Sequence, residues 1–265
     1  HLRRHGSTGC CLGPEYAAAY AGRAMVDATI AIHYPQDEGE ANSVLENCET
    51  ALKINPGLAD AYAALGQYYS ALAEPDECIK NASRAIELDR SSAEAHSILG
   101  VAHLRPGGYE TAYCHLKKAY ALDQGVWISM MLLTSLNGVD RPTERRHYAR
   151  QVLADMRKRV EINPHDIGAT FMIASACADL GDADQARHWI AISTAFATDD
   201  ARLTYNIACT QSRLGLIDAA LDMLARTLKL GVSDSKFIHA KSGDPDLKLV
   251  RQDPRFAEMF AAANR

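Results

Sequence analysis

The chain repeats itself at a spacing of 34 residues, and this period restricts the fold more than any other feature of the sequence. When residues 93–124 are aligned beneath residues 59–90, Leu99-Gly100 falls on Leu65-Gly66 and Ala119 falls on Ala85. A unit of this length cannot bury its apolar face alone, so neighbouring units must stack to make a continuous core. The sequence therefore predicts an array of similar units.

Each unit is expected to contain two helices joined by a turn. Tyr62, Leu65 and Tyr69 are three and four positions apart, which places them on one face of a helix. Gly66 leaves room for a neighbouring helix to approach closely. Pro75 ends the first helix and suits the start of the second, where its missing N–H does no harm. Small residues on the facing stripes predict closely packed antiparallel helices.

This spacing and order resemble the tetratricopeptide repeat (TPR). The resemblance implies an all-α fold, a right-handed superhelical solenoid of about six helix-turn-helix repeats with a C-terminal helical cap. We expect twelve repeat helices, a helical tail and no strand of consequence. The expected boundaries are a disordered or cloning-derived segment at 1–13, repeats at 14–56, 59–92, 93–125, 126–164, 167–198 and 201–231, and capping helices at 232–265.

The tail breaks the repeat pattern and is expected to close the open end of the array. Two Asp-Pro pairs each match an N-cap residue followed by proline at the first helical position. Short helices are therefore expected from Pro245 to about Gln252 and from Pro254 to about Ala263. The apolar face of the second should cover the last repeat helix; the alternative is a loose arm presented to a partner. The residues expected to meet are Phe256, Met259 and Phe260 with Leu221, Leu224 and Leu228.

Composition narrows the classes of protein. Hydrophobic residues make up 48% and charged residues 23% of the chain, as in folded proteins. A net charge of −5 gives no reason to expect nucleic-acid binding, and no apolar run is long enough to span a membrane. The cysteines form no CxxC motif. Helical patterns contain Cys48, Cys78, Cys177 and Cys209, several of them at packing positions. A reducing, cytoplasmic location and no metal or cofactor are expected.

A narrower resemblance bears on function. The opening PEYAAAYAGRAMVDATIAIHY and the closing YNIAC…LG…DPDLKLVRQDPRF resemble TPR regions of bacterial signalling proteins, attached to class III adenylate cyclases, winged-helix activators or Ser/Thr kinases. That resemblance implies a regulatory module with an effector domain upstream. No GxGxxG, GxxxxGK[ST], GxSxG or HExxH motif occurs, so no catalytic residue and no enzyme is predicted. The prediction is a scaffold that binds a peptide or protein segment; the alternative is a small-molecule sensor that uses the same groove.

The TPR resemblance also implies which residues line the concave groove. These residues lack the Lys/Asn set that grips a chaperone's C-terminal carboxylate, and they suit an extended or helical peptide. Tyr205 and Arg213 are the expected anchors by residue type. The full predicted set is Ala63, Gln67, Ser97, Val101, Arg105, Phe171, Met172, Ser175, Arg202, Tyr205, Asn206 and Arg213.

Two further features have a structural and a functional interpretation. His96 and His103 share a helix face and His115 follows on the next helix, which would suit a metal or pH-sensitive site. The first two occupy the positions of Tyr62 and Tyr69, however, so packing is the favoured interpretation. The basic helix at residues 145–159 could attract an acidic partner, but a solvated surface is favoured there.

Overall fold

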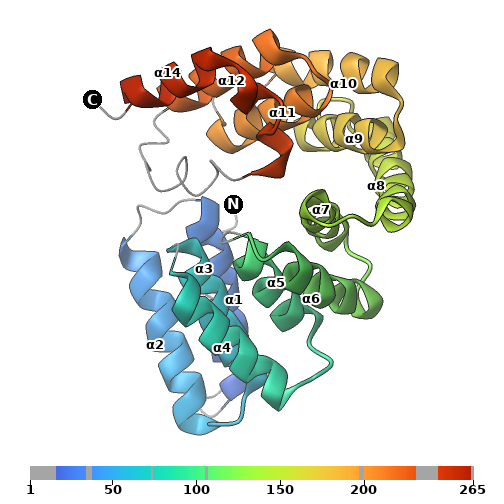
Figure 1. Ribbon diagram of the computed structural model, residues 1–265. Helices are drawn as coiled ribbons and strands as arrows, with labels where there is room; N and C mark the ends of the chain where they lie inside the picture. The colour runs from blue at the N-terminus through green and yellow to red at the C-terminus, as the bar shows by residue number, and fades with distance from the viewer. Residues whose placement is uncertain are drawn as a thin grey trace. The chain divides into compact units, whose positions relative to one another are not determined.

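The computed structural model describes residues 16–33, 38–72, 74–104, 107–196, 200–230 and 244–263. Over these ranges the chain forms helices joined by turns, and no strand occurs in them. Successive helices form hairpins (Figure 1). The predicted all-α fold of helix-turn-helix repeats is therefore confirmed. Among the helices described, none is both long and apolar enough to cross a membrane.

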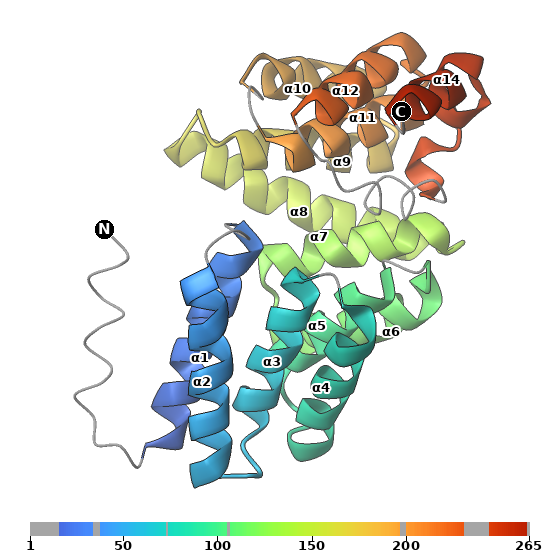
Figure 2. The same cartoon turned by 90° about the vertical axis from the view of Figure 1, so that its left-hand side faces the viewer.

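The chain divides into two compact units, and the N-terminal one spans His1–Ile128. It contains three hairpins: α1 (Ala17–His33) with α2 (Glu38–Ile54), α3 (Ala59–Ala71) with α4 (Pro75–Leu88), and α5 (Ala93–Leu104) with α6 (Tyr109–Leu122). Helix α3 packs against α1, α4 and α5, so each hairpin stacks on the next (Figure 2). This stacking buries the apolar stripe that a single hairpin would leave exposed.

Small residues set the close approach of these helices, as the sequence predicted. A Cβ atom at Gly66 would lie 3.3 Å from the backbone nitrogen of Ala82, and one at Gly100 would lie 2.6 Å from Cγ of Leu116. Cys48 and Cys78 are each 1% exposed and pack as small hydrophobic residues. The two glycines therefore lie at helix–helix contacts.

The C-terminal unit spans Ser129–Arg265, so the division falls within α7 (Val126–Ser135). A short 3₁₀ turn, η3 (Leu136–Gly138), follows α7 and leads into α8 (Pro142–Ile162). Helices α9 (Ile167–Leu180) and α10 (Ala183–Phe196) form the next pair, and α11 (Ala201–Arg213) and α12 (Ile217–Lys229) form the last. Helix α9 packs against α8, α10 and α11.

The 34-residue period extends to polar groups in the core of this unit. The Ser193 hydroxyl donates to Thr170 Oγ1 at 3.1 Å, and the Thr227 hydroxyl donates to Thr204 Oγ1 at 2.9 Å. All four side chains are buried, and each pair joins the two helices of one hairpin. Buried hydroxyls satisfied in this way avoid the cost of desolvation without a partner.

One prediction for the tail is wrong and another is confirmed. The helix expected over Pro245–Gln252 is instead two 3₁₀ turns, η4 (Pro245–Leu247) and η5 (Val250–Gln252). A 3₁₀ turn repeats every three residues, which brings Leu247 and Val250 to the same side, where they are 2% and 0% exposed. Helix α14 (Pro254–Ala263) forms where it was expected. Asp253 accepts the N–H of Arg255 and so acts in the predicted capping role.

The described part of the tail packs onto the last repeat. Turn η4 contacts α11, whereas η5 and α14 contact α12. Phe256, 9% exposed, shares a core with Leu221 and Leu224 of α12, and Met259 packs against the same core. These contacts agree with the capping interpretation. The side chain of Phe260 and residues 231–243 lie outside the described part of the chain.

Candidate binding site in the C-terminal unit

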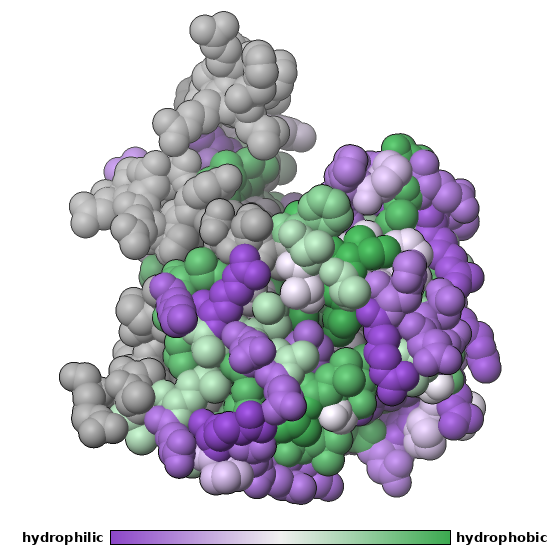
Figure 3. Space-filling view, turned by 90° about the horizontal axis from the view of Figure 1, so that it is seen from above, coloured by the Kyte–Doolittle hydropathy of each residue, from purple (hydrophilic) through white to green (hydrophobic). Residues whose placement is uncertain are grey.

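The predicted groove residues differ in how accessible they are. In the N-terminal unit, Ala63 and Ser97 are buried, and Gln67 and Val101 are half-buried on α3 and α5. Arg105 lies outside the described residues. In the C-terminal unit, two are buried (Phe171, Tyr205), three are half-buried (Met172, Ser175, Arg213) and two are exposed (Arg202, Asn206). In the view of Figure 3, polar and apolar side chains are interspersed over the surface.

Tyr205 and Arg213, the two expected anchors, hold a short segment of the chain itself. This acidic segment is Asp244–Leu247, which includes η4. The Tyr205 hydroxyl donates to Oδ2 of Asp244 at 2.9 Å. Burial raises the pKa of Tyr205, and Cys209 and Asp244 raise it further. The phenol therefore remains protonated and able to donate this bond.

Arg213 contacts the acidic segment and α9 together. Its Nη1 lies 3.8 Å from Oδ1 of Asp246. Its Nη2 lies 3.0 Å from Oδ1 of Asp179 and donates to the carbonyl of Ser175 at 3.2 Å. Burial acts to lower the pKa of Arg213, but the carboxylates of Asp179 and Asp246 outweigh it and the net pKa is raised. The guanidinium stays charged, and its planar donor set fixes the position of both carboxylates.

Asp179 is the charge on which two arginines converge. Its side chain is 2% exposed, and Oδ1 also accepts from Nε and Nη2 of Arg145 at 2.9 and 2.6 Å. Arg145 is the first of the basic residues of α8, so part of that helix serves a buried ion pair rather than a solvated surface. Breaking such a pair is costly, because it leaves a buried charge without compensation.

Asp246 is held by a third element. Its Oδ2 accepts from Nδ2 of Asn137, in η3, at 2.6 Å. Burial raises the pKa of Asp246 to about 6, although Arg213 acts in the opposite direction. Backbone N–H of Asp246 also donates to Oδ1 of Asp244 at 2.9 Å, which fixes the two carboxylates relative to each other. The acidic segment is thus bound through both acidic side chains.

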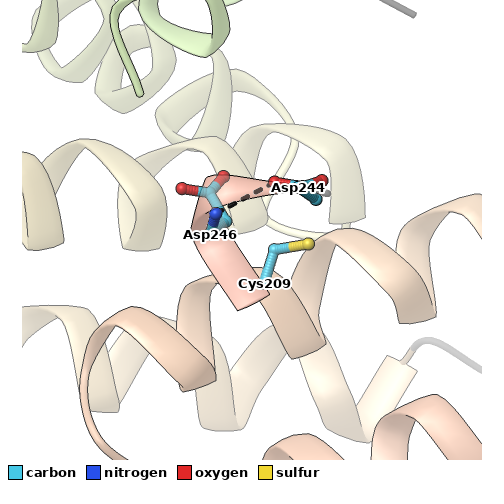
Figure 4. Close-up of side chains that lie close together, drawn as sticks. All are labelled: Cys209, Asp244 and Asp246. Atoms are coloured by element: carbon cyan, nitrogen blue, oxygen red, sulfur yellow. Dashed lines mark hydrogen bonds between the residues drawn. The ribbon is translucent and has the colours of Figure 1, made fainter. Parts of the chain in front are cut away.

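Cys209, Asp244 and Asp246 lie together, with potential ligand atoms within 4.8 Å of one another (Figure 4). The carboxylate oxygens already accept hydrogen bonds, from Tyr205, from Asn137 and from the backbone. The adjacent guanidinium also opposes a cation. The cluster is therefore better explained as an internal contact of the acidic segment than as a metal centre.

A pocket of about 340 Å³ adjoins these residues. It is open to solvent and presents three guanidinium groups and one carboxylate. Arg213 and Asp179 thus belong both to this pocket and to the contacts around the acidic segment. The lining residues are Pro142, Arg145, Arg146, Ala178, Asp179 and Arg213.

Sequence reasoning missed the partners of the two anchors. Asn137, Asp179 and Asp246 were not among the predicted residues, and Asp244 was considered only as a helix cap. One signal was available for the ion pairs, because Arg145, Asp179 and Arg213 are each 34 residues from the next and alternate in charge. No comparable pattern points from Asn137 to Asp246, which are 109 residues apart.

Comparisons with known proteins agree with this architecture. Residues 59–92 match the family model described as "Tetratricopeptide repeat". The chain is similar to a tetratricopeptide repeat protein from Parabacteroides merdae (13% identity, 97% of this chain and 87% of that chain, TM-score 0.53). It is also similar to pilF of Pseudomonas aeruginosa (18% identity, 88% and 97%, TM-score 0.51). A third similar structure is the APC/C hetero-tetramer Cut9–Hcn1 (13% identity, 93% and 53%, TM-score 0.54). At these identities the likeness establishes a shared TPR fold. Arrays of this fold generally mediate protein–protein interaction.

Proposed function

We propose that this chain is a non-enzymatic scaffold that binds acidic protein segments in the concave groove of its TPR array. The observation that carries the proposal is that Tyr205 and Arg213, predicted as anchors by residue type, each contact a carboxylate of the acidic segment. Tyr and Arg are the residue types that most often dominate binding energy at protein interfaces. The chain's own segment is then the resting occupant of a peptide site.

The contacts define what a partner segment should contain. Two acidic residues two positions apart satisfy Tyr205 and the Asn137–Arg213 pair, and a large apolar residue follows directly, as Leu247 does at 2% exposure. Charged hydrogen bonds give this recognition its strength, and the buried leucine adds apolar area. The partner class is therefore an acidic peptide with the pattern Asp-x-Asp-Leu.

A partner must displace the chain's own segment, whose effective concentration is high because it is tethered. The test therefore uses the full chain with Asp244→Ala and Asp246→Ala, which weakens the resting contact because the acceptors for Tyr205 and Asn137 are lost. A fluorescent peptide DPDLKLVRQ (residues 244–252) should bind this variant more tightly than the unaltered chain in an anisotropy titration.

Matched controls show whether binding depends on the two carboxylates of the peptide and on Tyr205. The same peptide with both aspartates changed to alanine should not bind. Tyr205→Phe in the variant chain should weaken binding, whereas Arg187→Gln, at an exposed arginine of α10 outside the predicted groove, should not. Equal binding of both peptides, or no binding to any chain, would show that the acidic segment is only a structural cap. Gln67 and Val101 remain predicted contacts of the N-terminal unit.

The wider role follows from the resemblance of both ends of the array to bacterial signalling proteins. In this proposal the array is the cytoplasmic regulatory part of a longer signalling or transcription-regulating protein, and it controls an effector domain upstream. Sequencing the gene beyond the codon for His1 tests this directly. An open reading frame without any effector domain would contradict it.

A second function has one observation in its favour, the arginine-lined pocket. A small anion there would contact Arg146 and compete for Arg213, which also faces the acidic segment. The array would then sense a small molecule and transmit its binding through the tail. Thermal unfolding in inorganic phosphate or citrate tests this, with Arg146→Gln as the variant expected to remove any stabilisation. Equal stabilisation of both chains would point to a general salt effect.

A further inference from the structure

Three histidines of the N-terminal unit come together on one hairpin. His96 and His103 lie on α5, and His115 lies on α6. The Nδ1 atoms of His96 and His115 are 3.2 Å apart. The rings of His103 and His115 stack with an interplanar angle of 15° and centroids 6.2 Å apart. His96 is 3% exposed, which agrees with its predicted packing role, but packing alone does not require ring nitrogens to face each other.

The hydrogen positions of the facing pair follow from their surroundings. Nε2 of His96 lies 3.3 Å from the carbonyl oxygen of Arg90. Because a carbonyl can only accept, Nε2 carries the hydrogen, and Nδ1 of a neutral His96 has a free lone pair. Nδ1 of His115 must then be the donor within the pair. In the neutral pair, these contacts hold both rings in defined tautomers.

His96 is buried and His115 is half-buried, so both rings are largely removed from water. Neutral imidazole is the form that ligates metal ions. A ring whose second nitrogen donates to a backbone carbonyl, as His96 does, has the support that metal-binding histidines generally have.

We propose that His96 and His115, joined by His103, form a site for a divalent transition-metal ion such as Zn²⁺. Two nitrogen ligands about 2.0–2.1 Å from a tetrahedral ion lie roughly 3.3–3.4 Å apart, close to the spacing of this pair. His103 supplies the third ligand after turning about its side-chain bonds, and water supplies the fourth. The site lies in the N-terminal unit and is independent of the acidic-segment site.

Metal binding needs one proton rearrangement. The hydrogen on Nδ1 of His115 leaves to solvent while Nε2 of the same ring takes one up, so the ring stays neutral and no net proton is released. A site with imidazole ligands alone favours zinc, copper or nickel over magnesium and calcium, which prefer oxygen. The bound ion would link α5 to α6 and stabilise their hairpin.

The test titrates the full chain with ZnCl₂ by calorimetry and follows thermal unfolding. His96→Gln and His115→Gln should each weaken binding of one zinc equivalent at least tenfold, whereas His188→Gln, an exposed histidine on α10, should not. MgCl₂ should have no effect. Zinc affinity unchanged in both hairpin variants would overturn the proposal.

A second measurement tests the site without any substitution, in case the histidine variants fail to fold. It also distinguishes zinc bound to these histidines from zinc bound to cysteine thiols. Long-range ¹H–¹⁵N spectra of the unaltered chain report the tautomer of each imidazole. Zinc should shift Nδ1 of His96 and His115 together and change the tautomer of His115. Unchanged resonances of both rings at saturating zinc would refute the site.

Discussion

Replacing Gly100 by alanine should destabilise the N-terminal unit, although alanine is the better helix former. The new Cβ would lie 2.6 Å from Cγ and 3.0 Å from Cδ2 of Leu116, and 3.3 Å from the carbonyl oxygen of Ala112. Leu116 is 0% exposed, so its side chain cannot swing into solvent. The hairpin of α5 and α6 must therefore open slightly or Leu116 must leave its preferred rotamer.

The magnitude follows from two opposing terms. Overpacking a close contact lowers the free energy of unfolding by about 1–3 kcal/mol. Replacing a helical glycine by alanine raises it by about 1 kcal/mol. The net expectation is a loss of about 0–2 kcal/mol. Gly22→Ala is the matched control, because nothing lies within 4 Å of its Cβ position and only the favourable term applies. Gly66→Ala, with a nearest contact of 3.3 Å, should fall between them.

Urea unfolding followed by far-ultraviolet circular dichroism measures this series. All three glycines lie in the N-terminal unit and so report on the same transition. The midpoint should rank Gly22→Ala above Gly66→Ala above Gly100→Ala at constant slope. Leu116→Met, which is unbranched and adaptable, should restore part of the loss in the Gly100→Ala background. A Gly100→Ala chain as stable as the Gly22→Ala chain would refute the argument.

Three further predictions concern the C-terminal unit. Asp179→Asn should lower the free energy of unfolding by about 3–5 kcal/mol, since two arginines lose a buried partner. The control Asp184→Asn, at a carboxylate that is 97% exposed, should leave the urea unfolding curve unchanged. Burial raises the pKa of Asp246 to about 6, so the stability contributed by its protonated form is complete below about pH 3.8 and lost as the pH rises through 6. Asp246→Asn should therefore make the melting temperature less dependent on pH between about pH 4 and 6. An unchanged pH dependence of the melting temperature would contradict this. Phe256→Ala should cost about 3–5 kcal/mol if the tail is a cap, whereas Leu249→Ala, 42% exposed, should have little effect; equal stability of the two in thermal melts would favour a loose arm.

The 34-residue period predicted those structural features that depend on residues close together in the sequence. Helix order, the proline-marked turns and the close contacts at Gly66 and Gly100 all follow from residues within one repeat or from its neighbour. Tyr205 and Arg213 could be singled out because the TPR resemblance implies which positions line the groove, and their residue types favour an anchoring role. Their partners could not, since the contact to Asp246 depends on where the tail folds back. The tail does not follow the 34-residue period. Its Asp-Pro pairs indicate helix capping, and this pattern does not reveal that Asp244 also accepts a hydrogen bond from Tyr205.

The bond between Asn137 and Asp246 has a consequence for synthesis of the chain in the cell. The two residues are 109 positions apart, so at about 5–20 residues per second the ribosome needs roughly 5–20 s to supply the second after the first. Arg213 precedes Asp246 by 33 residues, so it lacks one of its two carboxylate partners for roughly 2–7 s of that interval. Under the proposed function, an acidic partner would therefore meet Arg213 during synthesis before the competing acidic segment of the tail has been made.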